Sequence, residues 1–80
     1  MRTTNFIFCI EAEQHNSVLV KMLAAILRRR LRLVSFRSHS GREDVLQVVF
    51  TVIETPENAQ KFFKQLDKQI DIISIIFFVQ

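Results

Sequence analysis

The sequence predicts one α+β domain whose strands and helices follow the order βαββαβ. Four segments have the apolar alternation or the β-branched and aromatic content of strands, and two others repeat their apolar residues with helical spacing. The chain has 80 residues, of which 49% are hydrophobic, with one Gly and one Pro. These values are typical of a single folded domain over residues 1–80, and not of a disordered or linker-like chain.

The first strand is predicted over residues 5–12, which are apolar on both faces and therefore suit a central position in a sheet. Asn16 and Ser17 then supply a helix N-cap. The first helix is predicted to run to about Arg30. Its apolar face is formed by Leu19, Met22, Leu23, Ile26 and Leu27.

The second strand is predicted over residues 32–39, where Val34 and Phe36 face inward between polar neighbours, as in an edge strand with one wet face. A polar hairpin loop follows over residues 38–42, around the only glycine, which can take a positive φ. The third strand starts near Asp44. One of its faces is formed by Leu46, Val48, Phe50 and Val52.

The second helix is predicted from Thr55 as N-cap and Pro56 at the first helical position, where the missing N–H of proline is no loss. Its apolar stripe is Ala59, Phe62, Phe63, Leu66 and Ile70. The solvated side opposite this stripe carries Lys61, Lys64, Gln65 and Lys68. The last strand is predicted over residues 71–79, which are rich in β-branched and aromatic side chains.

The predicted order is that of the ferredoxin-like split unit, a four-stranded antiparallel sheet with two helices on one face and the first and third strands at its centre. Two helices can cover only one face of this sheet, yet the first, third and last strands are apolar on both faces. We therefore expect another chain to bury the second face or a sheet edge, and the isolated chain to be a dimer or larger.

The sequence lacks the residue combinations of common catalytic and metal sites. Glu11, Glu13 and His15 alternate along one segment, but no second cluster of ligands accompanies them, so a solvated loop is the preferred interpretation. His39 lies in the hairpin without an orienting acid. We therefore predict no catalytic residue, no metal site and no enzymatic activity in this chain.

The cellular location of the protein is predicted from the single cysteine and from the absence of a signal peptide and of a membrane span. Cys9 is the only cysteine, so no disulfide can form within the chain, and its apolar neighbours favour a buried thiol. The first residues have no long apolar segment of a signal peptide, and no stretch reaches the roughly 20 apolar residues of a membrane span. These features predict a cytoplasmic protein with no membrane partner.

The net charge of +3 depends largely on a basic cluster of five arginines between Arg28 and Arg37. Three of them fall in the last helical turn, where cations complement the helix dipole. An RNA-binding sheet of this topology would show aromatic residues in a glycine-containing strand motif, whereas residues 45–53 offer only Phe50. A solvated or protein-contacting surface is therefore preferred over a nucleic-acid site.

Residues 65–75 read Gln-Leu-Asp-Lys-Gln-Ile-Asp-Ile-Ile-Ser-Ile, and residues 30–36 lead from the first helix into the second strand. Both segments resemble the small regulatory subunits of acetohydroxyacid (acetolactate) synthase, in which a Gln-Leu/Ile-x-Lys-Leu-x-Asp-Val-x-x-Val pattern recurs. These subunits belong to the ACT-domain family, whose βαββαβ order agrees with the order predicted above. The chain is most similar to the short, ACT-only small subunits of the second isozyme type.

The resemblance also implies an effector site. In members that bind an amino acid, the ligand lies at the dimer interface, between the loop after the first strand and the partner's second strand. The corresponding residues here are His15, Asn16, Ser17, Val18, Leu33 and Val34. His15 and Leu33 stand at family asparagine positions, although Asn16 adjoins the first of these, and Val18 and Leu31 stand at glycine positions. These replacements imply weak or absent valine binding.

The resemblance implies a non-catalytic small subunit that forms a homodimer and activates or stabilises the catalytic large subunit in branched-chain amino acid biosynthesis. Thiamine diphosphate, Mg and FAD would be held by that catalytic subunit and not by this chain. Two alternatives remain. One is a free-standing ACT-like sensor of a small amino acid that regulates another enzyme, and the other is a basic, nucleic-acid-binding ferredoxin-like module.

Overall fold

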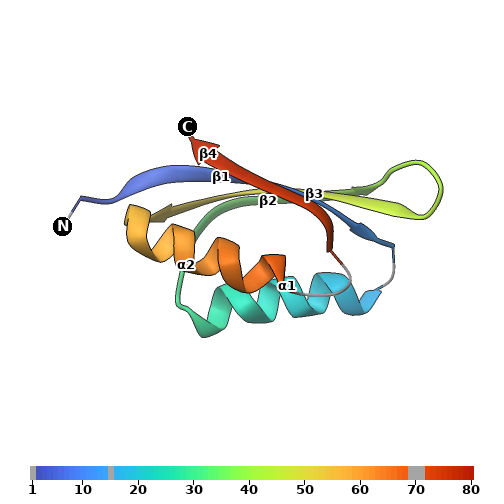
Figure 1. The fold of residues 1–80 in the computed structure, drawn as a ribbon, viewed down its shortest axis with the longest axis horizontal. Helices are drawn as coiled ribbons and strands as arrows, with labels where there is room; N and C mark the ends of the chain where they lie inside the picture. The colour runs from blue at the N-terminus through green and yellow to red at the C-terminus, as the bar shows by residue number, and fades with distance from the viewer. Residues whose placement is uncertain (1, 15, 69–71) are drawn as a thin grey trace.

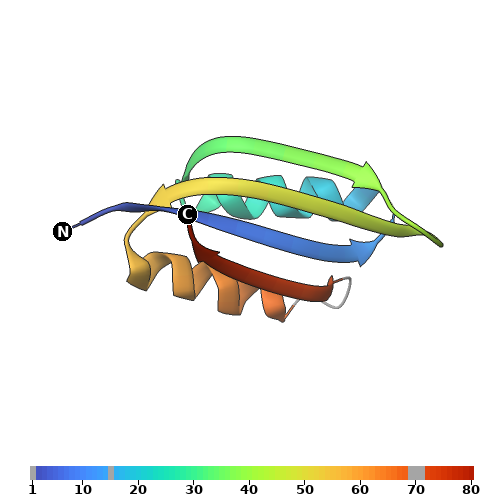
Figure 2. The ribbon, with the colours of Figure 1, turned by 90° about the horizontal axis from the view of Figure 1, so that it is seen from above.

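The computed structural model describes residues 2–14, 16–68 and 72–80, and it consists of two layers, a four-stranded sheet and a pair of helices. The elements are β1 (Thr4–Glu13), α1 (Asn16–Arg28), β2 (Arg32–Ser40), β3 (Val45–Glu54), α2 (Pro56–Asp67) and β4 (Ile72–Val79). Neighbouring strands are antiparallel in the order β2-β3-β1-β4, so β1 and β3 are central as predicted. Both helices lie on one face of the sheet (Figure 1), and in the described part of the chain no helix covers the other face (Figure 2).

The core between the layers is built around one row of phenylalanine rings. Phe36, Phe50, Phe8 and Phe77 occupy paired positions on β2, β3, β1 and β4. Adjacent rings in the row are stacked, with centroids 5.0 to 5.9 Å apart. Phe62 of α2 meets Phe8 edge-on at 5.5 Å. Because aromatic pairs stabilise beyond their apolar burial, this row ties all four strands to the helical layer.

The buried face of α1 differs from the predicted one. Its buried residues are Val18, Met22, Ala25 and Ile26. Leu23 is 38% exposed and Leu27 is 75% exposed, so the prediction that both lie on the inner face is wrong. The prediction favoured the larger side chains, but a small residue such as Ala25 allows close approach of the helix to the sheet, which turns the two leucines outward.

The ends of α1 also differ from the prediction. The helix begins at Asn16, so the predicted cap residues Asn16 and Ser17 stand within its first turn. At the other end the helix stops at Arg28 and not at Arg30. These are shifts of one or two residues, and the extent of the helix is otherwise as predicted.

The chain leaves α1 through a Schellman motif. The backbone N–H of Leu31 donates to the carbonyl of Ile26 at 3.1 Å, and that of Arg30 donates to the carbonyl of Leu27 at 3.0 Å. Arg30 takes the left-handed conformation of this motif, with φ 55°. The helix-ending glycine that the resemblance aligned with Leu31 would therefore be needed one residue earlier.

β2 is an edge strand as predicted, but one of the two side chains that were predicted to face inward is exposed. The pairing with β3 shifts register between Leu33 and Ser35, so Val34 has no partner residue in that pairing and is 55% exposed. Phe36 remains half-buried, as predicted. The irregular register could not be read from the alternating pattern, because that pattern assumes a regular ladder.

The turn between β2 and β3 spans residues 41–44, and its conformation differs from the prediction. Positive φ values occur at Glu43 (50°) and Asp44 (62°) and not at Gly41. The backbone N–H of Gly41 donates to the carbonyl of Val45 at 2.6 Å, and a Cβ on this glycine would lie 3.1 Å from that oxygen. Close backbone approach, and not a left-handed conformation, is therefore the reason for glycine here.

α2 begins as predicted. The Thr55 hydroxyl oxygen accepts a hydrogen bond from the backbone N–H of Asn58 at 3.3 Å, and Pro56 follows at the first helical position. Ala59, Phe62 and Leu66 of the predicted stripe are buried, and Phe63 is half-buried. The predicted stripe residue Ile70 lies outside the described residues.

Candidate functional site

The candidate site is the open face of the sheet, which we define as the face opposite the helices (Figure 2). Its apolar centre consists of Ile7, Cys9, Val49, Thr51, Ile76 and Phe78, which occupy two adjacent rungs across β3, β1 and β4. Val49 is 43% exposed, Ile76 61% and Phe78 47%. Exposed apolar side chains that are contiguous over three strands are typical of a surface that another protein covers.

Two open hollows lie on this face. One, of about 290 Å³, is bordered by Cys9 and Ile76, and the other, of about 360 Å³, by Ile7 and Arg37. Val49 borders both. A small ligand in either hollow would be covered from one side only, whereas binding sites for small molecules bury most of the ligand. The hollows therefore suit side chains of a protein partner.

Charged residues frame the apolar centre and differ in sign between strands. Glu11 and Glu13 lie on the open side of β1, and Arg32 and Arg37 on the open side of β2. The Ser74 hydroxyl of β4 donates to a carboxylate oxygen of Glu11 at 3.0 Å. Because one strand is acidic and the other basic, a second copy related by a two-fold axis would offer charges of opposite sign to both.

The two edge strands are protected to different degrees. β2 carries two arginines and the register shift at Val34, and such features discourage pairing with a further strand. None of residues 72–79 of β4 is charged, and Ile73 is 58% exposed and Val79 59%. The outer edge of β4 is therefore the more favourable edge for contact with another chain.

The predicted effector residues before and within α1 have different environments. Ser17 is exposed near the start of the helix, while the Val18 side chain is buried in the core, so only the backbone of Val18 could face a ligand. His15 and the side chain of Asn16 lie outside the described residues. Gln14, just before them, donates from its side-chain amide to the Ser40 hydroxyl at 2.6 Å, which ties this loop to the end of β2.

The predicted effector residues of β2 lie at the other end of the sheet. Leu33 is 40% exposed, Val34 is 55% exposed, and Leu33 is on the same rung as Phe6. Phe6 and Glu13 are seven residues apart on β1, which corresponds to roughly 23 Å at 3.3 Å per residue. One chain therefore does not bring Leu33 and Val34 together with Ser17.

Sequence reasoning predicted the uncovered face and which residues of β1 and β3 lie on it, but not the β4 residues Ile76 and Phe78 that complete its centre. The parity of β1 and β3 was visible in the sequence, whereas the pairing of Ile76 with Cys9 and of Phe78 with Ile7 depends on the register of β4. Long-range register is set by tertiary packing and leaves no local signal. The missed residues could have been found only by assuming a register.

No family model matches the sequence, and no curated protein matches it significantly. Solved structures do match in fold. The ACT domain of GTP pyrophosphokinase from Chlorobium tepidum is similar with a TM-score of 0.83 and 8% identity, over 95% of this chain and 99% of that one. The chain has the ACT fold, a ferredoxin-like βαββαβ arrangement. The predicted fold class is thereby confirmed.

Two further solved structures are similar in fold, also at low sequence identity. The C-terminal domain of the MgtC protein from Mycobacterium tuberculosis matches with a TM-score of 0.79 and 12% identity, over 95% of this chain and 86% of that one. The regulatory subunit of aspartate kinase from Thermus thermophilus matches with a TM-score of 0.69 and 15% identity, over 95% of this chain and 50% of that one. At these identities the likeness concerns the ACT fold alone.

Neither a metal centre nor a membrane-spanning helix is found in the described part of the chain. Among the described residues, no group of three or more His, Cys, Asp or Glu side chains could hold a metal ion. No helix in the same part of the chain is both long enough and apolar enough to cross a membrane.

Proposed function

We propose that this chain is a non-catalytic regulatory small subunit of acetohydroxyacid synthase. The observation that carries the proposal is the exposed apolar centre of the open face, because an ACT fold with such a surface is suited to binding another protein. The resemblance of residues 30–36 and 65–75 to the small subunits of that enzyme supports the choice of partner. The role would be to activate or stabilise the catalytic large subunit in branched-chain amino acid biosynthesis.

The two surfaces described above suit two different contacts. The open face would pack against a second copy of the chain, since its acidic β1 and basic β2 offer charges of opposite sign to an identical face. The uncharged edge of β4, with Ile73 and Val79, would remain accessible beside that interface for the catalytic subunit. In this arrangement the chain contributes binding energy, and the catalytic subunit contributes thiamine diphosphate, Mg and FAD.

Reconstitution tests the proposed function directly. The full chain is added to a purified acetohydroxyacid synthase catalytic subunit that was identified by copurification, and the rate of acetolactate formation is measured. We expect the rate to rise with added chain and to saturate. Ile73→Lys should abolish the rise, whereas Leu27→Lys, the same change at an exposed apolar residue of α1, should not. An unchanged rate at saturating wild-type chain would contradict the proposal.

A free-standing amino-acid sensor is the second candidate, and the contact between Gln14 and Ser40 favours it. Because this contact joins the loop before α1 to the end of β2, antiparallel pairing of two β2 edges would place Leu33 of one copy near that loop of the other, although the arginines and register shift of β2 oppose such pairing. Isothermal calorimetry with valine distinguishes the candidates. We expect weak or absent binding, since an unpaired buried polar group costs about 1 to 3 kcal/mol. A dissociation constant in the low micromolar range would favour the sensor.

A further inference from the structure

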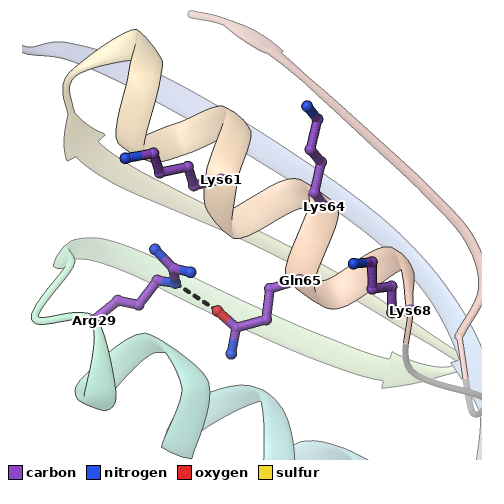
Figure 3. Close-up of a pocket in the computed structure, with 5 residues that line it drawn as sticks. All are labelled: Arg29, Lys61, Lys64, Gln65 and Lys68. Atoms are coloured by element: carbon purple, nitrogen blue, oxygen red, sulfur yellow. Dashed lines mark hydrogen bonds between the residues drawn. The ribbon is translucent and has the colours of Figure 1, made fainter.

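A second surface feature lies on the helical layer, on the side of the molecule away from the open face. It is an open groove of about 610 Å³ between the end of α1 and the second half of α2 (Figure 3). Its lining residues are Arg29, Lys61, Lys64, Gln65 and Lys68. The four charged residues are all cationic and all exposed, so the groove is one concentrated patch of positive charge.

The groove has a defined cross-link between its two walls. The Arg29 side chain reaches from the end of α1 to α2, where its Nε donates to the side-chain oxygen of Gln65 at 2.5 Å (Figure 3). Among the described residues no other partner binds its two terminal guanidinium nitrogens, which leaves a planar pair of donors. Lys61 and Lys68 lie on either side of Gln65 along α2, while Lys64 points away from Arg29 (Figure 3).

Among the described residues, no carboxylate neutralises the positive charge of the groove. Neither Arg29 nor any of the three lysines forms an ion pair with a carboxylate in residues 2–14, 16–68 or 72–80. Cations near a helix C-terminus complement the dipole, which accounts for Arg29, Lys64 and Lys68. Lys61 lies in the middle of α2, where the dipole has little effect, so helix capping does not account for the whole cluster.

We propose that this groove binds a small molecule that carries an oligophosphate group. Lys61 on α2 and Lys68, the C-cap of this helix, are seven residues apart, roughly 10 Å at 1.5 Å per residue, so the matching anion carries several charges over that length. Lysine binds phosphate as a point charge, and the free donor pair of Arg29 can bind two phosphate oxygens. A free amino acid fits poorly, because its ammonium group would be repelled. A nucleic acid would lack an aromatic surface on which to stack its bases.

The test uses the full chain with inorganic tripolyphosphate as the probe, measured by calorimetry at moderate ionic strength. We expect one tripolyphosphate per chain, and inorganic phosphate bound at least tenfold more weakly. Lys61→Gln/Lys68→Gln should weaken tripolyphosphate binding about tenfold or more, since each removes a charged hydrogen-bond partner. The control variant Arg2→Gln/Arg42→Gln removes the same charge at two exposed residues away from the groove and should change binding less than about twofold.

Each outcome decides the proposal. Absence of tripolyphosphate binding, or equal weakening in the groove variant and the control variant, would overturn it. Tighter binding of a short oligonucleotide than of tripolyphosphate, lost in the groove variant, would also overturn it in favour of nucleic acid. A nucleoside triphosphate bound as tightly as tripolyphosphate would support recognition of phosphates alone, and one bound more tightly would support a nucleotide as the ligand. Because no catalytic subunit is present, the result is independent of the proposed function.

Discussion

Adjacent residues of β1 belong to two surfaces that differ in what covers them. Phe8 is fully buried beneath the helices, whereas Ile7 and Cys9, its neighbours on both sides, lie on the open face and remain partly accessible. β3 repeats the contrast, with Phe50 buried and Val49 43% exposed. Both surfaces are apolar, so hydrophobicity alone does not distinguish the core from a binding face. The distinction depends on the helices, which cover one side only.

The largest expected effect on stability comes from a substitution in the core between the sheet and the helices. Phe8→Ala removes the ring that contacts Phe50, Phe62 and Phe77, and we expect it to lower the free energy of unfolding by about 3 to 5 kcal/mol. Denaturant unfolding of the dilute chain measures it. The matched change on the other side, Ile7→Ala, should cost only about 1 kcal/mol. Equal losses from the two variants would remove the contrast between the surfaces.

The next effect concerns association through the open side. Val49→Lys places a charge at the apolar centre, and we expect it to weaken dimerisation at least tenfold, or about 1.4 kcal/mol. Sedimentation velocity over a concentration series measures the dissociation constant. The control is Leu27→Lys, which changes an exposed leucine on α1 and should leave association unaltered. A wild-type chain that stays monomeric throughout the series would count against the dimer.

A smaller effect on stability is expected at the N-terminus of α2, one of the two helices that cover the sheet. Thr55→Ala removes the hydroxyl that caps α2, and we expect a loss of about 1 kcal/mol in the free energy of unfolding. Thr55→Ser keeps the capping oxygen and should lose less. Denaturant unfolding of both variants measures the difference. If the alanine and serine variants were equally stable, the cap would contribute nothing to holding the helix over the sheet.

The smallest expected effect is a gain in stability at the C-terminal end of α1, the other helix that covers the sheet. Arg30 occupies a left-handed position that glycine adopts without steric cost, so Arg30→Gly should raise the free energy of unfolding by roughly 0.5 to 1 kcal/mol. The thermal midpoint should rise by a few degrees, which calorimetry measures. The same change at Arg28, inside the helix, should be destabilising.

Much of this fold could be predicted because its signals are local. The Thr55 cap, Pro56 and the stripe of α2 are short-range features, and each is present as predicted in the described residues. The errors arose where tertiary packing determines which side chains face inward. The inner face of α1 excludes Leu23 and Leu27, and the register shift turns Val34 outward, although both patterns appeared regular in the sequence.

The candidate sites depend on contacts between distant segments, so the sequence could indicate them only in part. The open face was predicted as a surface in need of a partner, but the pairing of Ile76 with Cys9 required the register of β4. The basic groove was not predicted at all. Lys61 and Lys68 were assigned to a solvated helix face and Arg29 to a separate cluster, and only the packing of α1 beside α2 brings them together.

The reactivity of Cys9 tests the central claim, that another protein chain covers the open face. Cys9 is the only thiol of the chain and lies at the apolar centre, between Val49 and Ile76 on adjacent strands. The rate of modification by a water-soluble thiol reagent is measured from low micromolar to near-millimolar chain, for wild type and Val49→Lys. We predict that the wild-type rate constant falls as concentration rises, while the variant rate stays high. A wild-type rate constant that does not change with concentration would contradict burial of this face by a second copy.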